Sequence, residues 1–247
     1  MSEPSPVIRS DPANPYGTRP AAAGGAPSDR TAVRRLAKRG VYDAPTIHHI
    51  IDEALVCHVG FVDGGQPFVI PTLHARIDDR LYLHGSQASR MLAVIAEGAP
   101  ACITITLIDG LVLARSAFHH SVNYRSVVVL GTGREVTDPG EKQRVFERLV
   151  EHVAPGRWAD CRWPNDKEMN ATRLVSFPLD ESSAKVRVGP PVDDEEDYDL
   201  PHWAGLLPLI LQPGIPIADP RLKSGITTPV YLRPYRRPGA ESSPQTG

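Results

Sequence analysis

Hydroxyl and guanidinium side chains gather where a short apolar strand runs into a glycine turn, in the stretch Arg80-Leu81-Tyr82-Leu83-His84-Gly85-Ser86-Gln87-Ala88-Ser89-Arg90. The residues after this turn predict a helix, and a helix N-terminus favours anions because its first N–H groups are unpaired. Ser86 and Ser89 add short hydrogen-bond donors, and Arg90 adds a planar, charged fork that suits phosphate. The stretch is therefore a candidate phosphate site. The alternative is that Ser86 only caps the helix and Arg90 is a solvated surface residue.

Short strands and a few helices must position this turn. Alternating apolar residues and turn signals predict a sheet of about seven strands, and regularly spaced antiparallel strands favour a barrel over βαβ units. We expect strands over 55–62, 67–75, 80–84, 101–108, 111–136 (interrupted near His119-His120), 173–178 and 184–188, with Asp109-Gly110 as a turn. We expect helices over 29–39 (stopped by Gly40), 43–53, 87–97 and 138–154.

Composition limits the classes of protein that fit. The formal net charge of −2 argues against a nucleic-acid partner bound through bulk charge. No apolar run approaches the roughly 20 residues that cross a bilayer, so we expect no membrane partner. Three widely spaced cysteines and an N-terminus without an apolar signal segment favour the cytoplasm. We expect a disordered tail over 1–27, a main domain over 28–200 and a wrapping, proline-rich C-terminal segment over 201–247.

Four segments, in order along the chain, resemble the flavin-nucleotide-binding branch of the pyridoxamine 5'-phosphate oxidase-like split barrels, which includes nitroimidazole-resistance-type reductases. The match spans about residues 30–235. The segments are Gln66-Pro67-Phe68-Val69-Ile70-Pro71-Thr72, Leu81-Tyr82-Leu83-His84-Gly85-Ser86, His120-Ser121-Val122-Asn123-Tyr124-Arg125-Ser126-Val127, and Ala184-Lys185-Val186-Arg187 with Trp203-Ala204-Gly205.

This resemblance implies a mainly β fold, an antiparallel six-stranded split β-barrel, and a homodimer with FMN bound in a groove between subunits. The backbone around Pro71 and Thr72 would face the isoalloxazine ring. Ser86, Ser89 and Arg90 would hold the FMN phosphate. The other cofactor-binding residues that it implies are His84, Gly85, Tyr124, Arg125, Ser126, Lys185 and Trp203.

Several of these residues have simpler interpretations. Alternate side chains of a strand face opposite ways, so Tyr124 and Ser126 share one face and Arg125 lies on the other. Lys185 is equally an ordinary exposed charge, and Trp203 is equally a core residue. The chain also departs from the pyridoxamine phosphate oxidases, because no Arg-x-His substrate clamp follows Trp203. That departure argues against pyridoxal-phosphate synthesis.

Two classes of function stay open. The first is an FMN-dependent oxidoreductase acting on a small-molecule substrate, with chemistry supplied by the flavin and no identifiable catalytic residue. The second is a non-catalytic flavin-nucleotide-binding protein or a haem-binding sensor. Haem would need one axial histidine in an apolar slot, and His84 or His120 are the candidates. No His, Cys or carboxylate spacing indicates a zinc site.

Overall fold

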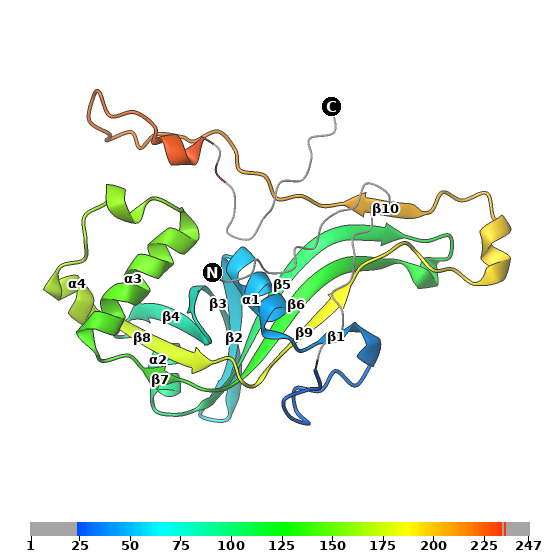
Figure 1. Cartoon of the computed structure of the whole chain (residues 1–247), viewed down its shortest axis with the longest axis horizontal. Helices are drawn as coiled ribbons and strands as arrows, with labels where there is room; N and C mark the ends of the chain where they lie inside the picture. Colours follow the sequence, from blue (N-terminus) through cyan, green and yellow to red (C-terminus); the bar gives the residue numbers. More distant parts are fainter. Residues whose placement is uncertain (1–23, 234, 236–247) are drawn as a thin grey trace.

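A computed structural model describes residues 24–233 and 235 (Figure 1). Its strands form one sheet in the order β1-β9-β6-β5-β2-β3-β4-β8-β7, and β10 pairs with β5. The strands are β1 (Gly40–Val41), β2 (Val56–Asp63), β3 (Gln66–Ile77), β4 (Arg80–Ser86), β5 (Pro100–Leu113), β6 (Ser121–Thr132), β7 (Arg134–Glu135), β8 (Thr172–Pro178), β9 (Ser182–Arg187) and β10 (Gly205–Pro208). Every ladder is antiparallel.

Among the described residues, four α-helices flank the sheet: α1 (Ala44–Glu53), α2 (Arg90–Ala96), α3 (Pro139–Val153) and α4 (Asp166–Ala171). Each begins at a side chain that accepts a hydrogen bond from a backbone N–H of the first turn, which is the usual N-cap chemistry. These caps are Asp43, Ser89, Asp138 and Asn165. None of the helices in the described part of the chain combines the length and apolarity needed to cross a membrane.

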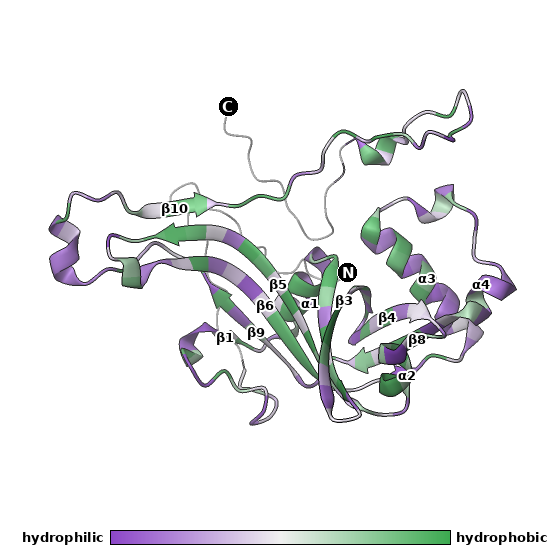
Figure 2. Ribbon diagram, turned by 180° about the vertical axis from the view of Figure 1, so that it is seen from behind, coloured by the Kyte–Doolittle hydropathy of each residue, from purple (hydrophilic) through white to green (hydrophobic). Residues whose placement is uncertain are grey.

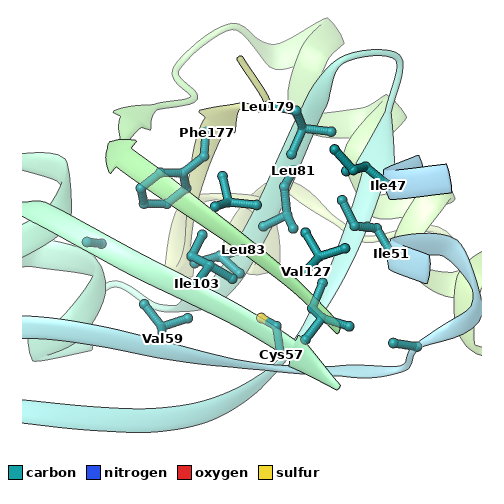
Figure 3. Close-up of a cluster of buried hydrophobic side chains, with 14 of the residues drawn as sticks. Ile47, Ile51, Cys57, Val59, Leu81, Leu83, Ile103, Val127, Phe177 and Leu179 are labelled. Atoms are coloured by element: carbon teal, nitrogen blue, oxygen red, sulfur yellow. The ribbon is translucent and has the colours of Figure 1, made fainter. Parts of the chain in front are cut away.

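The sheet bends because β3 changes its partner along its length. Residues 66–73 of β3 pair with β2, whereas residues 74–77 pair with β4. The bend encloses the main core, in which side chains of α1, β2, β4, β5, β6 and β8 meet, among them Ile51, Val59, Leu83 and Phe177 (Figure 3). A second, smaller core forms where α3 packs on the other face of β3, β4 and β8.

The predicted fold class is confirmed: the structure is a mainly antiparallel, incompletely closed β-barrel with a few flanking helices. Seven strands have six or more residues among those described, and three shorter ones join them, against the six that the resemblance implied. Residues 1–23 of the predicted tail and most residues after 233 lie outside the described residues. The boundaries at residues 27 and 200 stay predictions.

Two of the expected elements are wrong. Residues 29–39 form turns and a three-residue 3-10 helix (Ala37–Arg39) instead of an α-helix, because Gly40 pairs with Lys185 as a strand and Leu36 has a left-handed backbone. Asp109-Gly110 is no turn. It is a bulge inside β5, which continues to Leu113 because β6 pairs with it on both sides of the irregularity.

β5 and β6 extend beyond the barrel as a long ribbon, and the chain returns along it (Figures 1 and 2). β10 pairs with the distal part of β5, from Leu113 to Gly110. Residues 209–229, which we call the C-terminal strap, then run from the ribbon to the helix-rich end of the molecule. There the Tyr231 ring packs on Gly156, and the Tyr231 hydroxyl donates to Asp160 Oδ2 at 2.8 Å. The strap is thus attached at both ends.

Candidate functional site

The corner between β4 and α2 carries the predicted phosphate residues. Ser89, and not Ser86 as the alternative interpretation expected, is the N-cap of α2, because its Oγ accepts from Leu92 N at 3.4 Å. The Ser86 Oγ accepts from Ala88 N at 3.2 Å within the turn. Both contacts use the hydroxyl oxygen as an acceptor, so each hydroxyl hydrogen is left to donate. Gly85 leaves room for Leu92, since a Cβ at this position would lie only 3.0 Å from Leu92 Cδ1.

Arg90 is held beside the β2–β3 hairpin. Its guanidinium carbon lies 4.0 Å from the centre of the Phe68 ring, and its Nε lies 3.8 Å from Asp63 Oδ2. Stacking occupies the flat face of a guanidinium and leaves N–H groups at its edge to bind an anion. More than half of the Arg90 side chain is exposed. The corner therefore offers two hydroxyls and one oriented cation.

Four of the other predicted residues lie on the same face of the sheet, which we call the open face: Pro71, Tyr124, Ser126 and Lys185. The register aligns Pro71 with His58 and Thr104, and it aligns Lys185 with Ser126 and Thr106. Tyr124 lies two residues before Ser126 on the same face, as the strand alternation predicted. The exposed apolar residues of this open face are Val56, Val62, Val69, Leu73 and Ile108. A face this apolar is unusual on a surface that only water covers.

Thr72 and Arg125 point away from this open face. Thr72 alternates with Pro71, and its neighbour Ile70 packs against the main core. The Arg125 guanidinium is bound to two carboxylates, with Nη2 at 2.9 Å from Glu53 Oε1 and 2.7 Å from Asp109 Oδ1. Burial alone would lower the pKa of Arg125, but the hydrogen bonds and charges of Asp109 and Glu53 outweigh it and raise the pKa. Arg125 thus joins α1 to the β5 bulge.

Trp203 lies just before β10, and its ring packs against Gly205. Its surface is 69% exposed. β10 lies on the ribbon side of the molecule, whereas α2 lies on the side of α3 and α4, in both views of the ribbon (Figures 1 and 2). Apart from Thr72 and Arg125, the single chain therefore brings the predicted residues together in three groups: the β4–α2 corner, the open face and the region of Trp203.

His84 lies on β4, directly before the phosphate turn. It is half-buried, and desolvation by burial lowers its pKa. Its Nδ1 is buried and has no hydrogen-bond partner among the described residues. His120, the other haem candidate, is exposed beside the far end of the ribbon, and its Nδ1 lies 3.0 Å from the Ser116 carbonyl oxygen. No group of three or more potential metal ligands occurs in the described ranges.

Sequence reasoning missed the partners of Arg125 and the position of His58. Glu53 and Asp109 are 72 and 16 residues from Arg125, and only the fold brings the three together. His58 stands in the middle of the open face, and the alternation Val56, His58, Gly60 was the signal that marks it. The prediction of a wrapping segment over 201–247 also gave no sign that the apolar residues of the strap would be exposed.

Comparisons with known proteins agree with this geometry. Residues 43–186 match the family model described as pyridoxamine 5'-phosphate oxidase. The flavocytochrome Anf3 from Azotobacter vinelandii is 40% identical, with 86% of this chain and 99% of that chain covered and a TM-score of 0.81. An FAD and haem binding protein from Mycobacterium smegmatis is 34% identical, with 79% and 96% covered and a TM-score of 0.76.

A more distant structure is that of a 5-nitroimidazole antibiotic resistance protein from Bacteroides thetaiotaomicron. It is 25% identical, covers 60% of this chain and 86% of its own, and has a TM-score of 0.51. No curated protein matches the chain. This structure represents the nitroimidazole-resistance-type branch that the four sequence segments resembled. The two more similar structures are of proteins whose names include haem or cytochrome.

Proposed function

Because the chain belongs to the pyridoxamine 5'-phosphate oxidase family, we propose that it is a redox protein that binds a flavin nucleotide and a haem. The observation that carries this proposal is the 40% identity to a flavocytochrome over 99% of that protein's length. Haem goes beyond the FMN that the sequence favoured. The structure fits both groups in its donor set, with hydroxyls and a cation for a phosphate and a half-buried, uncommitted imidazole for iron.

The residues of the β4–α2 corner would hold the flavin by its phosphate. Ser86 and Ser89 would donate their hydroxyl hydrogens, and Arg90 would supply the charge. FMN and FAD share the ring and the first phosphate, so the same corner serves either; the name of the Mycobacterium smegmatis protein includes FAD. When bound, the flavin supplies the redox chemistry, and the protein orients it and excludes water. Three free cysteines support the cytoplasm as its location.

We expect the purified protein to show both flavin absorbance and a Soret band. Denaturing the protein and separating the released cofactors by chromatography will distinguish FMN from FAD. A protein that binds neither cofactor, even after titration with each, would contradict the proposal. A yellow protein without a Soret band would favour the second candidate, a flavin-only oxidoreductase. Bleaching of the flavin by a reduced nicotinamide, followed by substrate-dependent reoxidation, separates an enzyme from a non-catalytic binding protein.

Arg90→Ala is expected to weaken FMN binding about tenfold to a hundredfold. A hydrogen bond to a charged group contributes roughly 1.5–3 kcal/mol, and each 1.4 kcal/mol is about tenfold in affinity. Riboflavin has no phosphate, so its affinity should hardly change. Titration calorimetry with both ligands measures the difference. Equal weakening of the two would show that the substitution disturbs the corner itself, and equal retention would show that Arg90 holds no phosphate.

We propose further that the protein works as a homodimer, in which each copy covers the exposed apolar surfaces of the other. The strap carries Leu209, Ile210, Leu211, Ile215, Ile217, Leu222 and Ile226, all of them exposed within one chain. Green segments on the strap and on β5 and β6 mark these apolar stretches in Figure 2. Each copy carries both the open face and the strap. A two-fold dimer can therefore bury these two surfaces on both copies. Within one chain, Trp203 is distant from the proposed flavin site. In a dimer, the Trp203 of one copy can lie near the flavin site of the other copy.

A further inference from the structure

One cation of the protein is buried without an anion beside it. Arg187, the last residue of β9, is the only buried arginine or lysine among the described residues, with 9% of its surface exposed. Arg115 and Arg125 are less deeply buried, and each lies in an ion pair, at 3.2 Å from Asp193 Oδ2 and 2.7 Å from Asp109 Oδ1. No carboxylate of the described chain forms an ion pair with Arg187. A buried charge is costly without a partner of opposite sign, so we expect Arg187 to bind an anionic ligand.

Neutral groups hold the Arg187 guanidinium in place. Its Nη1 donates to Asn123 Oδ1, and the Asn123 Nδ2 in turn donates to the Gly189 carbonyl oxygen at 3.2 Å. The Arg187 Nε is buried and has no hydrogen-bond partner within the described ranges. Nε and Nη2 form the side edge of a guanidinium, which binds two oxygens of a phosphate or carboxylate at once. Asn123 therefore fixes the group and leaves this edge for a ligand.

Two further cations lie close to Arg187. Lys185 lies two residues before it on β9, and the ladder pairs Lys185 with Gly40, which directly follows Arg39. Arg39 and Lys185 are half-buried, and neither has an ion pair in the part of the chain that the structure describes. Burial lowers the pKa of Arg187, and the charge of Arg39 lowers it further. Three cations thus gather without a counter-charge, although the chain as a whole has a net charge of −2.

We infer that Arg187, with Arg39 and Lys185, forms a phosphate-binding site separate from the β4–α2 corner. A phosphate ester carries up to two negative charges, which suits several cations better than the single charge of a carboxylate does. Four strands (β6, β5, β2 and β3) separate β9 from β4 in the sheet. Figure 1 shows β1 and β9 on the other side of the molecule from α3 and α4. The phosphate can belong to the second phosphate group of FAD or to a phosphorylated substrate, since both present the same oxygens.

The test compares Arg187→Gln with the matched control Arg34→Gln, which removes the same charge at an exposed position. Calorimetry measures the affinity for FMN, for FAD and, in protein already saturated with FMN, for inorganic pyrophosphate. Arg187→Gln is expected to weaken the binding of FAD or of pyrophosphate about tenfold to a hundredfold and to leave FMN binding unchanged. Arg34→Gln is expected to bind all three as the unaltered protein does.

The outcomes identify the source of the phosphate or overturn the site. Weaker FAD binding assigns the site to the cofactor, and weaker pyrophosphate binding in the FMN-loaded protein assigns it to a substrate. Unchanged affinity for both overturns the inference, as does an unaltered protein that binds neither. Equal weakening of FMN overturns it as well, because the site would then not be separate from the corner.

The site does not depend on the proposed function. If the unaltered protein binds no flavin, the proposed function fails, and titration of the flavin-free protein with pyrophosphate still tests the site. Should Arg187→Gln fail to fold, Arg39→Gln combined with Lys185→Gln removes the two half-buried cations instead. A folded double variant that binds FAD and pyrophosphate as tightly as the unaltered protein would equally overturn the inference.

Discussion

Arg125→Met is expected to lower the free energy of unfolding by about 3–5 kcal/mol, the cost of leaving a buried charge without its partner. Glu53 and Asp109 would then face each other's negative charge without the guanidinium between them. The side chains of Arg125 and Glu53 are less than one-sixth exposed, so water replaces little of the lost interaction. Denaturant unfolding of the cofactor-free protein measures the effect.

The matched control for Arg125 removes the stranded charges as well. Arg125→Met combined with Glu53→Gln and Asp109→Asn is expected to recover part of the lost stability, because no unpaired carboxylate remains. This test also decides between the two roles of Arg125. If Arg125 held the flavin instead, Arg125→Met would weaken flavin binding and leave the unfolding of the cofactor-free protein nearly unchanged.

Ile215→Asp combined with Ile217→Asp is expected to convert the proposed dimer into a monomer. These side chains are 91% and 96% exposed in the single chain, so two charges there should cost the monomer fold little. In a dimer that buries them, each aspartate would have to lose its water without gaining a partner, which is costly. Light scattering should change from about twice 26.9 kDa to 26.9 kDa, with little change in the circular dichroism spectrum.

The control for the strap is Ile215→Val with Ile217→Val, which keeps the surface apolar and should leave the mass unchanged. If the aspartate variant keeps its dimer mass, the second copy does not cover the strap. If the unaltered protein is itself a monomer with its flavin tightly bound, the proposed homodimer is wrong.

Local sequence signals predicted most of the fold. Asp43 and Asp138 cap the helices that they were expected to begin, and the β2–β3 hairpin turns between the two strands expected over 55–62 and 67–75. These features depend on residues close together in the chain, such as a capping carboxylate or a glycine with positive φ. The family resemblance is likewise confirmed by the family model that matches residues 43–186. It could be predicted because its four segments are local motifs in a fixed order.

The errors occurred where a distant part of the chain decided the outcome. Residues 29–39 have a composition that suits a helix, but pairing of Gly40 with Lys185 favours an extended backbone. Asp109-Gly110 has the composition of a turn, but the long pairing with β6 carries β5 through it. The contacts of Arg125 could not be predicted for the same reason, since no local pattern reports that a helix end and a bulge will converge.

The attachment of the C-terminal strap at both ends has a consequence for the order of assembly. A strap that is fixed at both ends is a closed loop, so a second copy lying within it must enter before one attachment forms. β10 is held by a ladder of four residue pairs, whereas the other end is held by tyrosine hydroxyls bonded to Asp160 and to the Val153 carbonyl at the exposed surface. The tyrosine end should therefore close last. Dimer formation would then be slow, depend on protein concentration, and end in a locked state that dilution reverses only after Tyr231 has left Asp160 and Tyr235 has left the end of α3.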